Sequence, residues 1–259
     1  MIEFYKYEGA GNDFILIDNR DHIFQATPEK VEDMCDRHFG IGADGLILLE
    51  NAEGYDFRMV YFNSDGHEST MCGNGGRCIV KFAYDLDLIG INTSFVAIDG
   101  PHQAEVLGES KISLEMIDVV EVEQVGSDYF LDTGSPHYVR KVPDVGGMDL
   151  VRSARSIRYN ERFQQEGTNV NFFEPLEDRL MIRTYERGVE DETLACGTGI
   201  TAVALVAELT GQNTHEGHSH LVARGGTLEV YYDREGNEFN NIRLVGPAKY
   251  VFKGEWPSE

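Results

Sequence analysis

The segment Glu192-Thr-Leu-Ala-Cys196-Gly-Thr-Gly199 has a near copy earlier in the chain, Glu68-Ser-Thr-Met-Cys72-Gly-Asn-Gly75. Each copy has a Glu, three further residues and then Cys-Gly-x-Gly, and the two cysteines lie 124 positions apart. Three more pairs match in the same order at nearly the same spacing: residues 44–50 with 168–174, 11–12 with 134–135, and Asn63 with Glu186. A constant spacing is typical of a repeated unit. The sequence therefore predicts two homologous halves, residues 1–116 with 249–259 and residues 117–248.

The clearest helix signals follow the two repeated cysteines. Residues 200–209 are apolar on almost every side, which is typical of a buried helix, and residues 76–86 have apolar side chains at helical spacing. Further helices are predicted from Thr27-Pro28 and over residues 153–163. Strands are predicted where β-branched and aromatic residues gather: residues 4–18, 57–63, 95–98, 111–117, 138–142, 180–185, 227–232 and 250–252.

These patterns predict an α+β fold with two pseudo-symmetric halves. In each half a β-sheet or barrel would wrap round a central helix, with Cys-Gly-x-Gly at the N-terminus of that helix. A helix N-terminus carries a partial positive charge, favours the ionised form of a thiol and binds carboxylates through its main-chain N–H groups. Cys72 and Cys196 would then face one another across an active-site cleft. Cys35 and Cys78 lack this glycine context and are predicted to be buried apolar residues.

Composition excludes several classes of protein. The chain has 259 residues, of which 41% are hydrophobic, and a formal net charge of −23, so it would repel nucleic acid and anionic membranes. Its longest apolar run, residues 200–207, is too short to span a bilayer. The first residues lack the basic start and apolar stretch of a signal peptide, and we expect a cytoplasmic protein. The four cysteines have no metal-ligand spacing, and no metal site is predicted.

Two opposed thiols suit the inversion of a stereocentre. One thiolate removes a proton from a carbon while the other group, as a thiol, returns a proton to the opposite face. Helix N–H groups that hold the neighbouring carboxylate would stabilise the charge that develops on it. This chemistry requires no cofactor.

The motifs resemble those of the diaminopimelate epimerase family, within the amino-acid racemases and epimerases that work without pyridoxal phosphate. They are Gly9-Ala-Gly-Asn-Asp-Phe14, Met71-Cys-Gly-Asn-Gly-Gly-Arg-Cys78, Gly134-Ser-Pro-His137 and Tyr185-Glu-Arg-Gly188 followed by Ala195-Cys-Gly-Thr-Gly199. The resemblance implies conversion of LL- to meso-diaminopimelate in the supply of lysine and cell-wall precursors. It also implies an amino-acid substrate and a homodimer.

The resemblance also implies the roles of individual residues. Cys196 would take the proton from the LL substrate and Cys72 would return one, with His137 and Glu186 assisting. Substrate binding would involve Asn12, Asn63, Gly73, Asn74, Ser135, Asn169, Glu186, Arg187, Gly197 and Thr198. Arg187 suits the distal carboxylate because its planar guanidinium can bind a carboxylate through two hydrogen bonds.

Three features depart from the pattern of many members: Gly45 stands in place of Gln, Ser135 in place of Asn, and residues 188–193 are one residue longer. These changes concern substrate recognition and leave the cysteine pair intact. The alternatives are a cofactor-independent racemase of another amino acid, such as histidine or proline, and a non-catalytic binding protein. A thiol oxidoreductase is disfavoured because the chain has no C-x-x-C motif.

Overall fold

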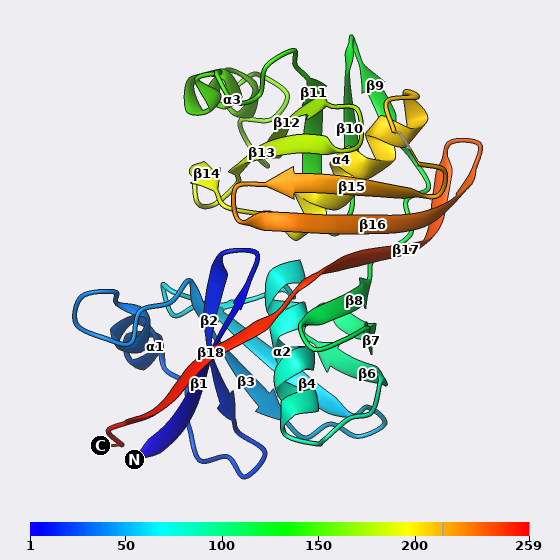
Figure 1. The fold of residues 1–259 in the computed structure, drawn as a ribbon. Coiled ribbons are helices and arrows are strands. Elements are labelled where there is room, and N and C mark those ends of the chain that lie inside the picture. Colours follow the sequence, from blue (N-terminus) through cyan, green and yellow to red (C-terminus); the bar gives the residue numbers. More distant parts are fainter. Residues whose placement is uncertain (214, 259) are drawn as a thin grey trace. The chain divides into compact units, whose positions relative to one another are not determined.

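The computed structural model describes residues 1–213 and 215–258, and strands predominate in it (Figure 1). Contacts divide the chain into two compact units, Met1–Leu114 with Gly246–Glu259 and Glu115–Val245. The described residues include four helices, and none of these is long and apolar enough to cross a membrane. The mixed content of strands and helices confirms the predicted α+β class.

The first unit contains two helices, α1 (Pro28–Cys35) and α2 (Gly73–Asp85). Its strands are β1 (Ile2–Gly9), β2 (Asn12–Asp18), β3 (Gly45–Glu50), β4 (Phe57–Asn63), β5 (Glu68–Ser69), β6 (Asn92–Ala97), β7 (Gly100–Val106), β8 (Lys111–Glu115) and β18 (Lys249–Trp256). The pairs β1/β2, β3/β4, β6/β7 and β7/β8 are antiparallel, whereas β2/β3 and β4/β6 are parallel.

The second unit also contains two helices, α3 (Leu150–Arg158) and α4 (Gly197–Leu209). Its strands are β9 (Glu123–Val125), β10 (Asp128–Asp132), β11 (Pro136–Lys141), β12 (Asn169–Pro175), β13 (Leu180–Glu186), β14 (Asp191–Thr193), β15 (His218–Ala223), β16 (Gly226–Glu235) and β17 (Glu238–Pro247). The pairs β10/β11, β12/β13, β15/β16 and β16/β17 are antiparallel, whereas β11/β12 and β13/β15 are parallel.

The two units therefore use one pairing pattern, strand for strand, from β1 to β8 and from β10 to β17. The segments matched in the sequence occupy equivalent places in it. Residues 44–50 contain β3, and residues 168–174 contain β12 except its last residue. Asn63 and Glu186 end the strands that pair antiparallel with β3 and β12, respectively.

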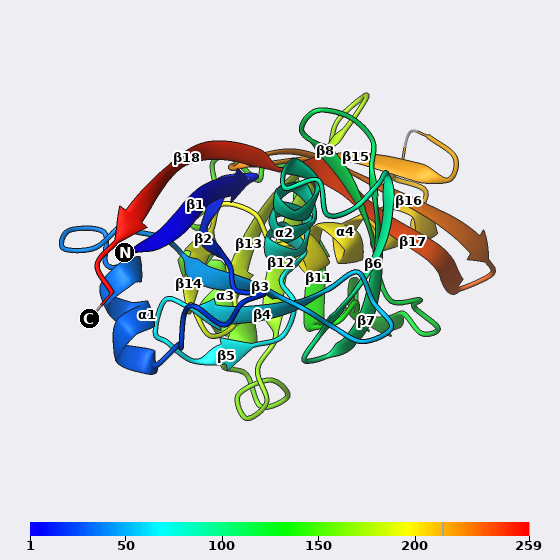
Figure 2. The same cartoon turned by 90° about the horizontal axis from the view of Figure 1, so that it is seen from below.

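One buried helix follows the cysteine motif in each unit. In the first unit α2 packs against β1, β2, β3, β4, β7 and β18. In the second, α4 packs against β10, β11, β12, β13, β15 and β16, and Figure 2 shows it (yellow) beside β15 and β16 (orange). Ile200, Val203 and Leu205 of α4 are completely buried. Each such side chain stabilises the fold by about 1.5–3 kcal/mol, so the core of the unit fixes the start of α4.

Two local predictions need correction. The stretch 4–18 is two strands, because Ala10 and Gly11 have φ angles of 54° and 82° and turn the chain back on itself. The helix predicted over 153–163 is α3, which begins three residues earlier because the Asp149 side chain accepts a hydrogen bond from the N–H of Arg152. It ends at Arg158, and the Asn160 side chain then accepts main-chain hydrogen bonds in a turn.

Candidate active site

Cys72 and Cys196 have the same place in their units. Each is the N-cap residue of its helix, with extended backbone angles of φ −95°, ψ 131° for Cys72 and φ −109°, ψ 113° for Cys196. Neither side chain accepts a cap hydrogen bond from the first turn. Each sulfur therefore belongs to a residue at the positive end of a buried helix, as the sequence predicts.

A chain of hydrogen bonds leads to the sulfur of Cys196. Its Sγ lies 3.4 Å from Oγ1 of Thr198, and this oxygen lies 2.9 Å from Nε2 of His137. On the other side of the ring, Nδ2 of Asn171 lies 3.0 Å from Nδ1 of His137. Because the amide nitrogen donates, Nδ1 accepts and Nε2 carries the proton that is donated to Thr198. Asn171 and Thr198 thus fix the orientation of the imidazole. The imidazole in turn orients the Thr198 hydroxyl beside the sulfur of Cys196.

The electrostatics of His137 favour a neutral ring. Burial, aided by the positive charge of Arg187, lowers its pKa to about 3. At neutral pH the ring is therefore uncharged. This favours a role in positioning Thr198 over a role as a proton carrier.

The buried His137 also predicts a pH dependence of stability. Its pKa is lowered on folding, so between about pH 6.5 and pH 3 the unfolded chain binds a proton that the folded chain does not. The contribution of the neutral His137 to the free energy of unfolding is therefore fully present above about pH 6.5. It is lost as the pH falls, by about 1.4 kcal/mol per pH unit. Urea unfolding at a series of pH values measures this effect. As the pH falls, the free energy of unfolding should decrease more steeply for the wild-type chain than for His137→Gln, by the amount given. His67→Gln, at a side chain that is 77% exposed, is the control and should keep the wild-type slope.

Two further predicted binding residues of the second unit, Asn169 and Arg187, lie near the same ring. Nδ2 of Asn169 is 3.5 Å from Nε2 of His137, while its Oδ1 accepts a hydrogen bond of 2.8 Å from the N–H of Arg187. The Arg187 guanidinium donates to the main-chain oxygen of Glu166. Asn169 therefore lies between the histidine and the loop that carries Arg187, and its side-chain oxygen orients the main chain at Arg187.

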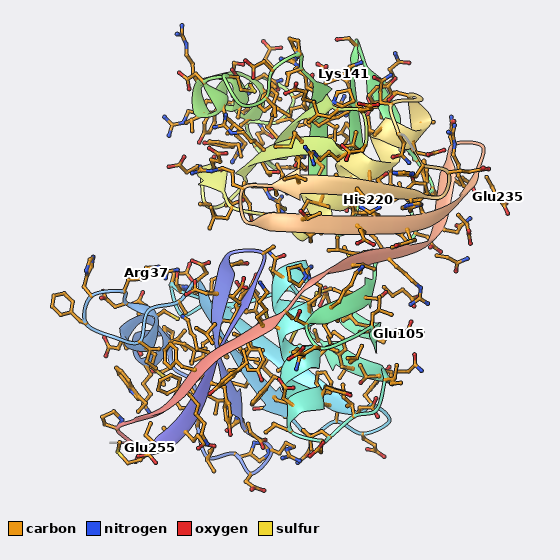
Figure 3. The ribbon with its side chains drawn as sticks, viewed as in Figure 1. Arg37, Glu105, Lys141, His220, Glu235 and Glu255 are labelled. Carbon is orange, nitrogen blue, oxygen red and sulfur yellow. The ribbon has the colours of Figure 1, made fainter. Side chains whose placement is uncertain are left out.

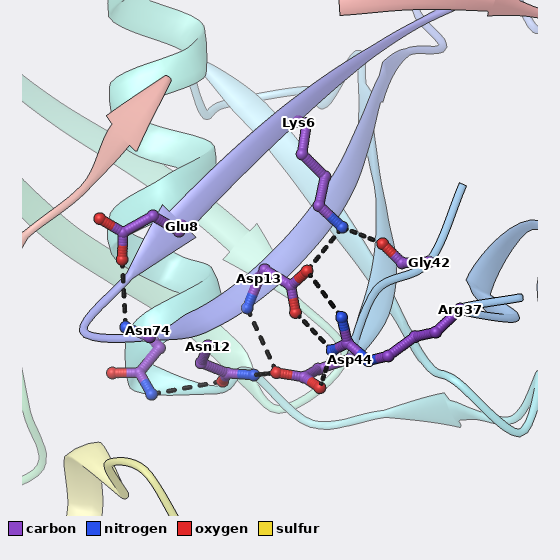
Figure 4. Close-up of polar contacts among 9 residues, drawn as sticks. Lys6, Glu8, Asn12, Asp13, Arg37, Gly42, Asp44 and Asn74 are labelled. Carbon is purple, nitrogen blue, oxygen red and sulfur yellow. Dashed lines mark hydrogen bonds and ion pairs between the residues drawn. The ribbon is translucent and has the colours of Figure 1, made fainter. Parts of the chain in front are cut away.

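In the first unit, Asn12 occupies the position next to the sulfur. Its Oδ1 lies 3.8 Å from Sγ of Cys72 and accepts a hydrogen bond of 3.3 Å from Nδ2 of Asn74. Its Nδ2 donates to Asp44 over 2.5 Å. Figure 4 shows this row of side chains at the N-terminus of α2. The structure thus brings together Cys72, Asn12 and Asn74, which the sequence predicts as site residues.

Known proteins were compared with this chain. The family model described as diaminopimelate epimerase matches residues 4–119 and 129–251. The diaminopimelate epimerase of Flavobacterium psychrophilum is 49% identical over 254 residues, covering 97% of this chain and 99% of that protein. The enzyme of Chlorobaculum tepidum is 48% identical over 257 residues, covering 95% and 98%. This chain belongs to the diaminopimelate epimerase family. The membership confirms the resemblance noted in the motifs and the predicted enzyme class, an isomerase.

Solved structures with low sequence identity share the fold of this family member. A phenazine biosynthesis protein of the PhzF family from Bacillus anthracis superposes with a TM-score of 0.74 at 14% identity, covering 99% of each chain. A probable proline racemase from Agrobacterium radiobacter gives 0.69 at 13% identity, covering 100% of this chain and 94% of the other. At these identities the likeness concerns the fold alone.

An ion-pair network supports Asn12 in this member of the diaminopimelate epimerase family, and no motif in the sequence predicts it. Arg37 binds Asp13 over 2.7 Å and Asp44 over 2.6 Å, and Lys6 binds Asp13 over 2.7 Å (Figure 4). Burial raises the pKa of Asp13, but hydrogen bonds from Arg37 and Lys6 outweigh it and lower the pKa to about 2. Asp44, which accepts the hydrogen bond from the Asn12 side-chain amide, is therefore held in place by Arg37.

Arg77 also supports the site, and the sequence patterns predict no role for it although it lies in the motif around Cys72. It is completely buried, and burial lowers the pKa of its guanidinium. The guanidinium donates to the main-chain oxygen of Gly73 over 3.0 Å, to Oδ1 of Asn74 over 2.8 Å and to the main-chain oxygen of Pro247 over 3.3 Å. Arg77 thus fixes the first turn of α2, directly after Cys72.

For three other positions noted in the sequence, Asn63, Ser135 and Gly45, the structure shows the local surroundings. Asn63 is held through its main chain, whose N–H donates to His67, and Ser135 lies half-buried in the turn between β10 and β11. Gly45 cannot carry a side chain here, because a Cβ would lie 2.5 Å from the main-chain oxygen of Phe62 and 2.6 Å from the Tyr61 ring. The departure at Gly45 is therefore matched by the bulk of its neighbours.

The remaining cysteines have the surroundings expected of buried apolar residues. Cys35 and Cys78 are 4% and 0% exposed. Burial raises the pKa of Cys35 to about 12 and that of Cys78 still further above the ordinary range. Both remain thiols at neutral pH.

Proposed function

We propose that this chain interconverts LL- and meso-diaminopimelate by two-base proton transfer between Cys196 and Cys72. The observation that carries the proposal is the equivalence of the two cysteines. Each is the N-cap of the buried helix in one of two units that share one strand-pairing pattern. In this proposal the two cysteines act on opposite faces of one α-carbon.

The chemistry begins at Cys196 when the LL substrate is bound. Its thiolate takes the proton from the α-carbon, and the Cys72 thiol then gives a proton to the opposite face. The α-carboxylate lies at the N-terminus of α4, where main-chain N–H groups of the first turn have no partner within the helix. These groups stabilise the charge that develops on the carboxylate during proton removal. Inversion leaves Cys196 as a thiol and Cys72 as a thiolate, so the reverse reaction starts from that state.

Thr198 and His137 position the first base. The Thr198 hydroxyl lies beside Sγ of Cys196 and takes its own orientation from the neutral ring of His137. Arg187 and Glu186, with Asn12, Asn63 and Asn169, are proposed to hold the distal carboxylate and ammonium. A substrate with charged groups at both ends suits this set of side chains better than histidine or proline does.

Incubation of the chain with LL-diaminopimelate in deuterated water tests the proposal directly. We expect the meso product to carry one deuterium at the inverted α-carbon, as nuclear magnetic resonance or mass spectrometry would detect. Proline and histidine, tested in parallel, should remain unlabelled. Deuterium in proline or histidine with none in diaminopimelate would assign the chain to a different racemase reaction.

We further propose that the chain forms a homodimer through β18. Tyr250, Val251 and Phe252 are consecutive on this strand and are 50%, 52% and 43% exposed. Clustered exposed apolar residues mark interaction surfaces. Sedimentation velocity should give the mass of two chains for the wild type and of one chain for Val251→Asp. The control Ile98→Asp, at a side chain that is 58% exposed in the first unit, should remain dimeric. A wild-type mass of one chain would contradict this proposal.

A further inference from the structure

Three histidines that the reaction does not use gather on the second unit. His218 and His220 are two positions apart on β15, so they project from the same face of the strand. His215 belongs to the segment that precedes β15. The ring centroid of His215 lies 4.8 Å from that of His218 and 5.4 Å from that of His220. The ring centroids of His218 and His220 are 5.2 Å apart. Figure 3 labels His220 on its strand.

The segment that carries His215 is tied to the elements around it. Nδ2 of Asn213 lies 2.5 Å from the main-chain oxygen of His215 and 2.7 Å from that of His218. The same nitrogen lies 2.8 Å from the Tyr232 hydroxyl and 3.1 Å from a carboxylate oxygen of Glu208 at the end of α4. One amide therefore holds the backbone of two of the histidines close to α4 and β16.

The neighbouring strand completes the surroundings of the cluster. In the antiparallel register of β15 and β16, His218 pairs with Tyr231 and His220 with Glu229, so these four side chains share one face. The Tyr231 ring stacks on His218 at 5.3 Å, and its hydroxyl donates to Glu229 over 2.7 Å. The Tyr231 ring thus packs against one side of the cluster, and the Glu229 carboxylate lies on the strand position that pairs with His220.

We propose that His215, His218 and His220 form a binding site for a divalent transition-metal ion such as Zn²⁺. Candidate ligand atoms of the three side chains all lie within 4.8 Å of one another. Imidazole nitrogens bind Zn²⁺ at about 2.0–2.1 Å, which places two nitrogens of a tetrahedral site about 3.3 Å apart. The candidate atoms are therefore at most about 1.5 Å farther apart than in a tetrahedral site, and side-chain rotation can close this difference because His215 is exposed and the other two are half-buried.

The ion would act on structure and not on the epimerase reaction. Its three ligands connect the segment after α4 to β15, and water or the Glu229 carboxylate supplies a fourth ligand. Imidazole ligands suit Zn²⁺, Cu²⁺, Ni²⁺ and Co²⁺ and disfavour Mg²⁺ and Ca²⁺.

Co²⁺ titration of the full chain in a phosphine reductant tests the proposal and separates it from binding at the cysteines. We expect visible d–d absorption that saturates at one Co²⁺ per chain, without the near-ultraviolet charge-transfer band of a cobalt thiolate. Zn²⁺ should displace the Co²⁺ and should raise the thermal unfolding temperature.

Matched variants identify the ligands. His215→Gln, His218→Gln and His220→Gln should each weaken Co²⁺ binding at least ~10-fold, a loss typical of disturbed metal sites. His38→Gln, at an exposed histidine of the first unit, should bind as the wild type does. Circular dichroism and metal-free epimerase activity of each variant monitor folding. Affinity unchanged in all three cluster variants, a thiolate band, or no saturable absorption would overturn the proposal.

Discussion

Replacement of either Cys196 or Cys72 by Ala should reduce epimerisation by ~10³-fold or more, within the range that general acid–base groups contribute. Each thiol serves one face of the α-carbon, so the loss of either prevents inversion. The remaining cysteine can still remove a proton from its own face and return one from solvent. Cys72→Ala should therefore put deuterium into LL-diaminopimelate without forming the meso isomer, and Cys196→Ala should label only the meso isomer.

Cys35→Ala is the matched control for these two variants. Cys35 is buried in an apolar cluster with Val31 and Met34, and its thiol stays protonated. Its replacement should leave the rate of epimerisation unchanged. Substantial turnover by Cys196→Ala, or labelling of both isomers by a single variant, would contradict a mechanism with one base for each face.

Gly199→Ala should reduce kcat by about 10- to 100-fold, the scale expected when catalytic groups shift by about an ångström. A Cβ at this position would lie 2.5 Å from Oδ1 of Asn171 and 3.3 Å from the His137 ring. Asn171 cannot withdraw easily. It is completely buried and bonded to His137 over 3.0 Å, to the main-chain oxygen of Tyr138 over 3.1 Å and to Thr184 over 2.9 Å.

The substitution therefore forces either the start of α4 or the Asn171 side chain to move, and both displacements disturb the hydrogen bonds that orient Thr198. A buried polar group that loses its partner costs about 1–3 kcal/mol, and urea unfolding should show a loss of this size. The structure supplies a control at the equivalent position of the first unit. The nearest atoms to a Cβ on Gly75 would be the side-chain ends of Ile47 and Met59, at 3.2 and 3.4 Å, and the edge of Phe14, none of which is main chain or hydrogen-bonded. Gly75→Ala should thus retain most of the activity, and equal losses in both variants would contradict this account.

The sequence alone determined the repeat, the class of the fold and the place of both cysteines. These features depend on local signals. The glycines after each cysteine and the apolar spacing beyond them specify a buried helix, whose observed bounds are Gly73–Asp85 and Gly197–Leu209. The motifs were enough to identify the family. Where local signals were weaker, as over residues 153–163, the prediction missed the true start of the helix at Leu150.

Tertiary structure decided which polar residues support the cysteines. Asn171, His137 and Thr198 come from β12, β11 and α4, and the contacts of His137 with the other two span 34 and 61 residues. The sequence shows Arg77 only as a charged residue, yet it is completely buried near the start of α2. The histidine cluster likewise depends on the return of the chain after α4. Hydrophobic periodicity reports which face of an element is buried and carries no information about which polar groups meet there, because those pairings depend on how strands and helices distant in sequence pack together.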